Sequence, residues 1–385
     1  MLGGAAPVRA HSAPMKSRAL LAFALVSAFT AFAAETPFYV GCYTKPGGAK
    51  GIYRYQLDLD TGKVTGGTLV AEAKNPTFLA VHPGGDYLYA ANENQDGTVG
   101  AYEILDDGGL KLLNVESAKG NGPCHLTLDG AGKNVIVANY GSGSIACLPV
   151  KEDGSLAPAS AAVQHKGSSV DKGRQEGPHA HSAYVDAAEK FVYACDLGLD
   201  QVLIYRLDAE KGGLTPADPP HATVPPGSGP RHLAFDPDGA HAYVINEMTS
   251  TISVFKHDAE TGALTAVQTL STLPAAFKGN NSTAEIFVHP NGRFVYGSNR
   301  GYDSIAIFGV DEQTGQLKAL GHASTGGKTP RNFAIDPTGM WLIAANQDTD
   351  NFTVLKIDPK TGGLKPTGQS VEVGMPVCVV FPPRK

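Results

Sequence analysis

Short apolar runs separated by polar turns account for most of the chain, and the stretch GPRHLAFDPDGAHAYVINE shows the repeating unit best. Two runs, His232–Phe235 and His241–Ile245, flank Asp236-Pro237-Asp238-Gly239, in which Pro and then Gly favour a tight turn between antiparallel strands. Arg231 stands at the start of the first strand, and Glu247 stands just after the end of the second. These positions lie side by side at the open end of an antiparallel hairpin, so the pattern predicts a guanidinium–carboxylate pair, either functional or an ordinary salt bridge.

This hairpin recurs along the chain, and the recurrence is the strongest structural signal in the sequence. A third strand-like run follows each hairpin, and a weaker fourth run leads to the next unit. The prolines at positions 76, 123, 178 and 230 are 47 to 55 residues apart, a period that fits a four-stranded propeller blade. The six hairpins begin at Asn75, Gly122, Gly177, Gly229, Ser282 and Thr329.

The two ends of the chain complete each other. The tail Gly374–Phe381 has the pattern of a first strand, and the head supplies two further strands in Phe38–Thr44 and Gly51–Asp58. We therefore predict an all-β, seven-bladed β-propeller over residues 35–385, closed by a blade shared between the N- and C-termini, which removes the exposed edges of an open array. Cys42 and Cys378 fall on neighbouring strands of this blade, either as a disulfide or as buried free thiols.

Composition agrees with this fold and excludes some classes of function. The 385 residues include 46 Gly and 26 Pro, and no segment sustains a helical period of apolar residues. With a net charge of -6 and no Lys/Arg cluster interleaved with aromatics, the chain lacks the pattern of a nucleic-acid binder. The five cysteines show no CxxC and no Cys/His ligand spacing, so a zinc site is not indicated.

The N-terminal segment has the pattern of a signal peptide over residues 1–34, with Met15 as an alternative start. Lys16 and Arg18 precede the apolar run Leu20–Phe32, and Ala31-Phe32-Ala33 resembles a cleavage site. No later apolar run is long enough to span a bilayer, so we expect a periplasmic or secreted protein with no membrane span after removal of the leader. A retained anchor is the alternative. A propeller with closed edges is expected to be a monomer.

The ends of the predicted strands gather polar side chains on one face of the ring. In each unit the start of the innermost strand and the end of the second strand surround the axis there, which predicts a central-channel site. For Asn92, Asn139 and Asn346 the alternative is that each caps a turn. The start positions hold His125, His179, His181, Arg231, His232, Glu285 and Arg331; the end positions hold Asn92, Glu93, Asn139, Asp196, Asn246, Glu247, Asn299, Arg300 and Asn346.

One connection, His165–His181, is long and polar, and we expect it to fold over the mouth of the channel. It would bring Arg174 and Gln175 near His179 and His181. Two histidines at i and i+2 point the same way on an extended strand and could ligate a metal together. Because no third ligand is clustered with them, the sequence indicates no metal and no other cofactor.

At these residues the chain resembles the lactonase family of seven-bladed propellers, which includes 6-phosphogluconolactonases and carboxy-muconate lactonising enzymes. The resemblance spans nearly everything after the leader. It is carried by FYVGCYT with GIYRYQLD, RQEGPHAHS, GPRHLAFDPDG with YVINE, STAEIFVHPNGRFVYGSNRG and TPRNFAIDPTG, in this order and spacing. It implies a metal-independent site near the axis with a His, two Arg and a Glu, which fall on His179 or His181, Arg231, Arg300 and Glu247.

The chemistry expected of these residues is hydrolysis of a small-molecule sugar lactone. A neutral His is the natural base near pH 7, and Arg231 or Arg300 could stabilise the oxyanion. Glu247 would orient Arg231 or the His. Because phosphorylated sugar lactones belong to cytoplasmic metabolism, the leader suggests an unphosphorylated one. We expect the substrate-binding residues to be Arg174, Gln175, His125, His232, Glu285, Arg331 and Asn346.

Two other functions remain open at this stage. A lactone-forming cycloisomerase of the muconate type would use the same residues, because addition and elimination across a ring C–O bond need the same groups. A binding propeller without catalysis is the second, since propellers also serve as scaffolds. A scaffold, however, has no need for His, Arg and Glu gathered at the axis.

Overall fold

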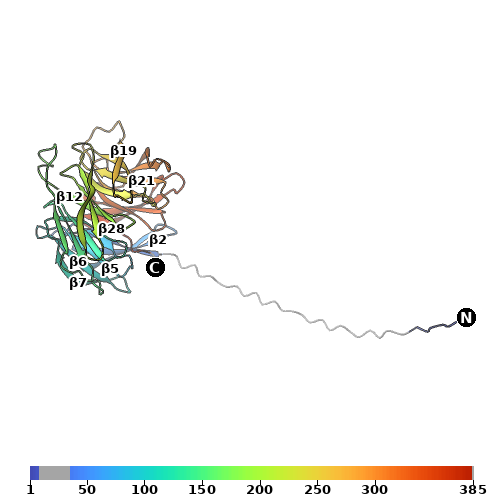
Figure 1. The fold of residues 1–385 in the computed structure, drawn as a ribbon. Helices are drawn as coiled ribbons and strands as arrows, with labels where there is room; N and C mark the ends of the chain where they lie inside the picture. The colour runs from blue at the N-terminus through green and yellow to red at the C-terminus, as the bar shows by residue number, and fades with distance from the viewer. Residues whose placement is uncertain (8–34, 384–385) are drawn as a thin grey trace. The chain divides into compact units, whose positions relative to one another are not determined.

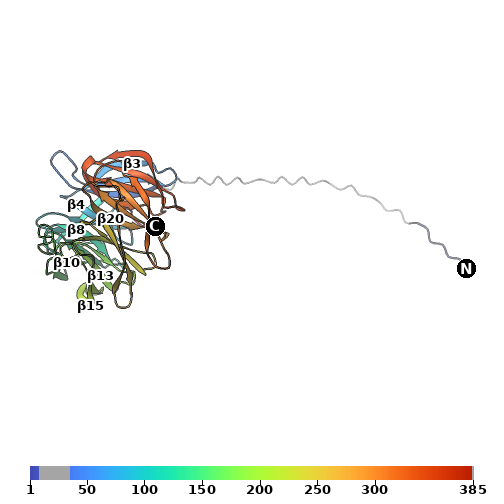
Figure 2. The same ribbon diagram turned by 90° about the horizontal axis from the view of Figure 1, so that it is seen from above.

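The computed structural model describes residues 1–7 and 35–383. In the described part of the unit formed by residues 33–385, the strands make seven four-stranded antiparallel sheets, each of which is one blade. Figures 1 and 2 show these blades from two directions. The predicted signal peptide falls largely on residues 8–34, which lie outside the described residues.

The strands of the first three blades follow one another along the chain. Blade 1 comprises β4 (Pro76–Val81), β5 (Tyr87–Asn92), β6 (Thr98–Ile104) and β7 (Leu110–Ser117). Blade 2 comprises β8 (Pro123–Leu128), β9 (Asn134–Asn139), β10 (Ser144–Pro149) and β11 (Ala161–Gln164). Blade 3 comprises β12 (Ala180–Val185), β13 (Phe191–Asp196), β14 (Gln201–Asp208) and β15 (Gly213–Thr223).

The next three blades repeat the same order. Blade 4 comprises β16 (Pro230–Phe235), β17 (His241–Asn246), β18 (Thr251–His257) and β19 (Leu264–Ser271). Blade 5 comprises β20 (Ser282–Val288), β21 (Phe294–Arg300), β22 (Ser304–Val310) and β23 (Leu317–Ser324). Blade 6 comprises β24 (Pro330–Ile335), β25 (Trp341–Asn346), the 3-10 turn η1 (Gln347–Thr349), β26 (Asn351–Ile357) and β27 (Leu364–Glu372).

Blade 7 joins the two ends of the chain, as the sequence predicts. Its order is β28 (Pro376–Val380), β1 (Glu35–Cys42), β2 (Gly51–Asp58) and β3 (Val64–Glu72), so the C-terminal strand is innermost and the N-terminal strands complete the sheet. Each innermost strand contacts the innermost strands of both neighbouring blades, and β28 contacts β24 on one side and β4 on the other. The ring is therefore closed, which confirms the predicted seven-bladed propeller.

Each hydrophobic core lies between two neighbouring blades. One cluster, for example, combines Phe191 and Tyr193 of β13 with Leu233 of β16, Val244 of β17 and Phe255 of β18. Because both faces of a sheet pack against a neighbour, the second strands β9, β13 and β25 are buried at all six positions. This explains why these strands read as continuous apolar runs in the sequence.

Buried tyrosines of the second strands latch one blade to the next. The hydroxyl of Tyr296 donates to the carbonyl of Gly362 at 2.9 Å, in a turn of the following blade. Tyr39, Tyr89 and Tyr193 make the same bond to Gly108, Gly154 and Gly262, at 2.9, 3.0 and 3.0 Å respectively. Tyr243 occupies the equivalent position of β17, but its buried hydroxyl has no partner among the described residues.

The disulfide considered for the closing blade is not formed. Cys378 pairs in register with Gly41, whereas Cys42 pairs with Pro376. This offset sends the two side chains to opposite faces of the sheet, where Cys42 packs in the core shared with blade 6 and Cys378 in the core shared with blade 1. Both are free buried thiols, so the ends of the chain are joined by backbone pairing and packing.

No helix in the part of the chain that the structure describes has the length and apolar character that a membrane crossing requires.

Two tyrosine variants measure how much the hydrogen bonds between blades contribute to the free energy of unfolding. We expect Tyr296→Phe to lower the free energy of unfolding by about 1–2 kcal/mol, because it leaves the Gly362 carbonyl without its donor. Tyr243→Phe should change it by less than about 0.5 kcal/mol, because the hydroxyl removed is unpaired. Urea unfolding of both variants checks this, and equal losses would contradict the latch.

Candidate active site

A β-bulge interrupts each of the seven innermost strands near its start. In β16, for example, Pro230 pairs with Asn246 and His232 with Ile245, which leaves Arg231 as the extra residue. Bulges re-aim side chains and recur beside active sites. The residues placed at bulges in this way include Thr77, Cys124, His181, Arg231, Arg331 and Val377, and all of these except His181 line one cavity on the axis.

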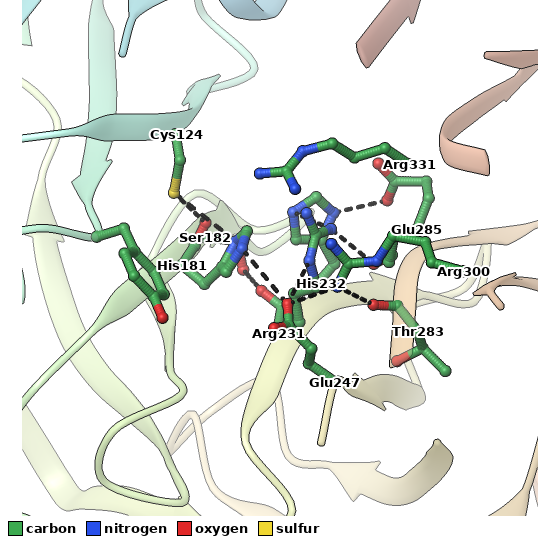
Figure 3. A network of polar contacts seen from close by, with 12 residues as sticks. Cys124, His181, Ser182, Arg231, His232, Glu247, Thr283, Glu285, Arg300 and Arg331 are labelled. Atoms are coloured by element: carbon green, nitrogen blue, oxygen red, sulfur yellow. Dashed lines mark hydrogen bonds and ion pairs between the residues drawn. The ribbon is translucent and has the colours of Figure 1, made fainter. Parts of the chain in front are cut away.

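Glu247 is the hub of the charged groups at the axis (Figure 3). Its Oε2 lies 3.1 Å from Nε of Arg231 and 2.9 Å from Nη2 of Arg300. Its Oε1 accepts a hydrogen bond of 2.7 Å from Arg174, which descends from the long loop at residues 165–179. The predicted Arg231–Glu247 pair is thus formed, and the long loop contacts this pair through Arg174.

Burial and charge act in opposite directions on these groups. Burial alone would raise the pKa of Glu247, but the charges of Arg300 and Arg231 and the hydrogen bond from Arg174 outweigh it and hold the pKa at about 2. Burial lowers the pKa of Arg300 to about 10, against the pull of Glu247. The cluster therefore carries one fixed negative charge that holds three guanidinium groups in place.

His181, and not His179, faces this cluster. Nε2 of His181 lies 3.9 Å from Oε2 of Glu247, which is too far for a hydrogen bond, and this nitrogen has no hydrogen-bond partner among the described residues. Burial and the nearby charge of Arg231 lower the pKa of His181 well below 6.5, so its imidazole is neutral near pH 7. Its Nδ1 lies 3.7 Å from the sulfur of Cys124.

His179 lies at the rim of the channel. Its Nδ1 is 3.1 Å from the carbonyl of Tyr140, its ring stacks on Tyr140 at 4.6 Å, and its Nε2 faces the exposed Glu176. The sequence left the choice between the two histidines open because both precede Ser182 on an extended strand. The bulge at His181 turns its side chain away from that of His179, so the two do not form a common ligand pair.

His232 and Glu285 form a buried chain behind Arg231. Nη1 of Arg231 donates to Nε2 of His232 at 3.2 Å, which places the ring hydrogen on Nδ1, and Nδ1 lies 2.7 Å from Oε1 of Glu285. Asn332 donates to Oε2 of Glu285 at 2.6 Å and accepts from the backbone N–H of Val379 at 2.8 Å. This chain of hydrogen bonds connects four blades and holds the guanidinium group of Arg231 in place.

Burial shifts the protonation of this pair strongly. It raises the pKa of Glu285 to about 7, and together with the charge of Arg231 it lowers the pKa of His232 well below 6.5. His232 and Glu285 are 2% and 3% exposed. Both hold Arg231 through the chain described above. They also line the small axial cavity beside Arg231, so direct substrate binding by His232 and Glu285 stays a prediction.

Three other predicted binding residues lie away from the charged cluster. Gln175 is fully buried, and its amide bonds to the backbone of Leu197 and Asp171, so it shapes the long loop. Asn346 is also fully buried and donates to the carbonyl of Thr325, and its side chain does not cap the 3-10 turn that follows it. His125 packs its ring against Phe78 and Tyr184, on the far side of the His232–Glu285 chain.

The structure adds residues that the sequence reasoning did not assign to the site. Tyr43 and Thr77 both bond to Glu93, and Arg331, which was predicted, donates to Tyr43. Thr77 and Cys124 each follow the proline that opens an innermost strand, as Arg231 and Arg331 do. The residue after that proline is therefore the sequence signal that would have found them.

No three His, Cys, Asp or Glu side chains within residues 1–7 and 35–383 are grouped as a metal site. The arrangement at the axis comprises the neutral imidazole of His181, the buried carboxylate of Glu247 and the guanidinium groups that pair with it. It can accept a proton at His181 and stabilise negative charge beside Arg231 and Arg300.

Comparison with known proteins places these features in a family. Residues 37–381 match the family model described as lactonase, 7-bladed beta-propeller. The chain is 38% identical to a 6-phosphogluconolactonase of Bacillus subtilis over 294 residues. The aligned part is 76% of this chain and 82% of that protein. It is 34% identical over 303 residues to a 6-phosphogluconolactonase of Formosa agariphila, with 76% and 84% covered.

A solved structure has a similar fold over almost its whole length. It is the periplasmic gluconolactonase of Pseudomonas aeruginosa, with a TM-score of 0.87 and 35% sequence identity, over 91% of this chain and 99% of that one.

The depressed pKa of Glu247 predicts a pH dependence of stability. Because this pKa falls from 4.5 to about 2 on folding, the carboxylate stabilises the fold above pH 4.5, and the stabilisation is lost as the pH falls toward 2. The shift corresponds to about 3 kcal/mol. Glu247→Gln should therefore be less stable than the unchanged protein at pH 6. Between pH 5 and pH 3 its free energy of unfolding should fall by less than that of the unchanged protein.

Urea unfolding at pH 6, 5 and 3 measures this effect. Glu260→Gln is the matched control, because that carboxylate is largely exposed in its pair with Lys190 and should leave the pH dependence as it is. An unchanged slope in Glu247→Gln would contradict the strong pairing of Glu247.

Proposed function

The chain belongs to the lactonase family of seven-bladed β-propellers, and from this premise we propose that it is a carboxylic ester hydrolase that opens a sugar lactone at the axial cluster around Glu247. The observation that carries the site assignment is the neutral His181 beside the Glu247–Arg231–Arg300 cluster. The named relatives are lactonases, and neither a muconate cycloisomerase nor a non-catalytic propeller gains support from them.

In the proposed reaction His181 acts as the general base. Its Nε2 takes a proton from a water molecule while the water oxygen adds to the acyl carbon of the lactone. Arg231 and Arg300 stabilise the oxyanion that forms. The bond between the acyl carbon and the ring oxygen then breaks, His181 returns the proton to that oxygen, and the product is an open-chain hydroxy acid.

Glu247 acts in this scheme by holding the arginines. With a pKa of about 2 it stays ionised and is a poor proton donor near pH 7. Its two oxygens receive Arg174, Arg231 and Arg300, so the guanidinium groups are positioned before a substrate arrives. The long loop carries Arg174, whose side chain is about half exposed while it is bonded to Glu247, so its exposed part is available to the substrate.

We further propose that the protein is exported and acts on an unphosphorylated sugar lactone. Two observations support this: the leader-like pattern of residues 15–34 and the likeness to a periplasmic gluconolactonase. The 6-phosphogluconolactonases among the relatives make the phosphorylated lactone the direct competitor.

The first test is proton release by residues 35–385 offered glucono-, 6-phosphoglucono-, galactono- and muconolactone, with and without EDTA. We expect release above the spontaneous rate with gluconolactone. Arg231→Ala should lower kcat/KM by about 100-fold or more, the effect of losing one oxyanion donor. Arg206→Ala, which removes an arginine that packs over Phe191, is the control and should keep the rate. Near-normal turnover in Arg231→Ala would overturn the assignment.

The pH profile tests the role of His181. A base whose pKa lies well below 6.5 stays neutral as the pH falls through 6.5, so the acid limb of kcat/KM should lie below that value. His179→Ala should leave the limb where it is, and His181→Ala should abolish it along with most of the rate. A limb that moves in His179→Ala and stays in place in His181→Ala would exclude His181 as the base.

A further inference from the structure

A second polar cluster, which we call the Glu93 cluster, lies on the axis and comprises Tyr43, Thr77, Glu93 and Arg331. It is built from four separate connections and strands: Tyr43 follows β1, Thr77 is the bulge residue of β4, Glu93 follows β5 and Arg331 is the bulge residue of β24. Thr77, Glu93 and Arg331 line the same cavity as Arg231. The Glu93 cluster therefore lies beside Arg231, one of the two arginines assigned to the proposed reaction.

Two hydroxyl groups of the cluster donate to one oxygen of Glu93, and Arg331 contacts one of these hydroxyls. Tyr43 donates its hydroxyl hydrogen to Oε2 at 2.7 Å, and Thr77 donates to the same Oε2 at 2.8 Å. Arg331 donates to the hydroxyl oxygen of Tyr43 at 3.2 Å, and its guanidinium lies over the Tyr43 ring at 5.6 Å from the centroid. Two hydroxyl donors thus hold Oε2 and orient the carboxylate of Glu93.

The other oxygen of Glu93, Oε1, has no hydrogen-bond partner in the described part of the chain. This matters because the two arginines that line the cavity, Arg231 and Arg331, have donors and no acceptor atoms on their side chains. Both oxygens of Glu247 are occupied by arginines. Glu93 Oε1 is consequently the carboxylate oxygen that remains open to a ligand.

A sugar lactone differs from a plain lactone ring by its hydroxyl groups, each of which must donate a hydrogen bond when it leaves water. We propose that Glu93, oriented by Tyr43 and Thr77, accepts a hydrogen bond from a substrate hydroxyl and so selects polyhydroxylated lactones over unsubstituted ones. This inference rests on the proposed lactonase function and divides the site in two. The Glu247 side performs the chemistry, and the Glu93 cluster recognises the hydroxyls.

The test compares two lactones with the same six-membered ester ring: glucono-δ-lactone, which carries hydroxyls, and δ-valerolactone, which carries none. In Glu93→Gln we expect kcat/KM for gluconolactone to fall about 10- to 100-fold, mainly through KM, because a charge-assisted hydrogen bond is weakened. For δ-valerolactone the change should be within about 2-fold. Where its turnover is slow, its inhibition constant against gluconolactone replaces kcat/KM.

Tyr43→Phe is the second variant and keeps the proposal testable should Glu93→Gln fold poorly. It frees Glu93 to rotate and should lower discrimination between the two lactones about 3- to 10-fold. Tyr39→Phe is its matched control, because Tyr39 lies in the same strand β1 but donates to Gly108 in the latch between blades. It should leave the discrimination unchanged.

The outcomes separate this inference from the function it rests on. Equal losses on both lactones would assign Glu93 to the chemistry or to folding, and no loss on either would leave it without a role; both results overturn hydroxyl recognition while the lactonase activity stands. An unchanged protein that opens no hydroxylated lactone would remove the proposed function, and hydroxyl recognition with it.

Discussion

The buried carboxylate of Glu247 is the interaction on which the axial site depends. Three guanidinium groups converge within 3.1 Å of its oxygens, and without it they would repel one another in a space from which water is largely excluded. Burying such a carboxylate is costly unless its partners compensate, and its low pKa of about 2 indicates that they do. The same charge holds the long loop against the ring through Arg174 and keeps Arg231 in reach of the cavity.

The propeller supplies the positions that this cluster needs. Each innermost strand starts at the same face, and the bulge in each strand turns one side chain away from the regular alternation. Seven such positions around one axis bring residues together that are more than a hundred positions apart in the chain, as Thr77 and Arg331 are. This geometry explains why several arginines lie close together at the axis although the chain as a whole has few charged residues.

Ring closure and the site are coupled through the chain of hydrogen bonds behind Arg231. His232, Glu285 and Asn332 carry that chain from β16 across β20 and β24, and it ends on the backbone of Val379 in β28. Since β28 is the C-terminal strand that closes the ring, docking of the two chain ends also completes the support of Arg231. The residues that support the site and those that close the fold thus belong to one network.

The sequence alone predicted the fold and the Arg231–Glu247 pair at the centre of the candidate site. Strand alternation, turn residues and a repeat of about fifty residues are local signals, so they predicted the blades, the shared closing blade and the Arg231–Glu247 pair, whose residues belong to one hairpin. The strand-end pattern also gave Arg300 and two candidate histidines, and the family resemblance gave them a role. Tertiary structure decided the rest, because it depends on bulges and on contacts between blades that no local pattern records. The bulge distinguished His181 from His179, and the strand register separated Cys42 from Cys378. Burial placed Gln175 and Asn346 in the scaffold, and convergence across the ring brought Tyr43, Thr77 and Glu93 together.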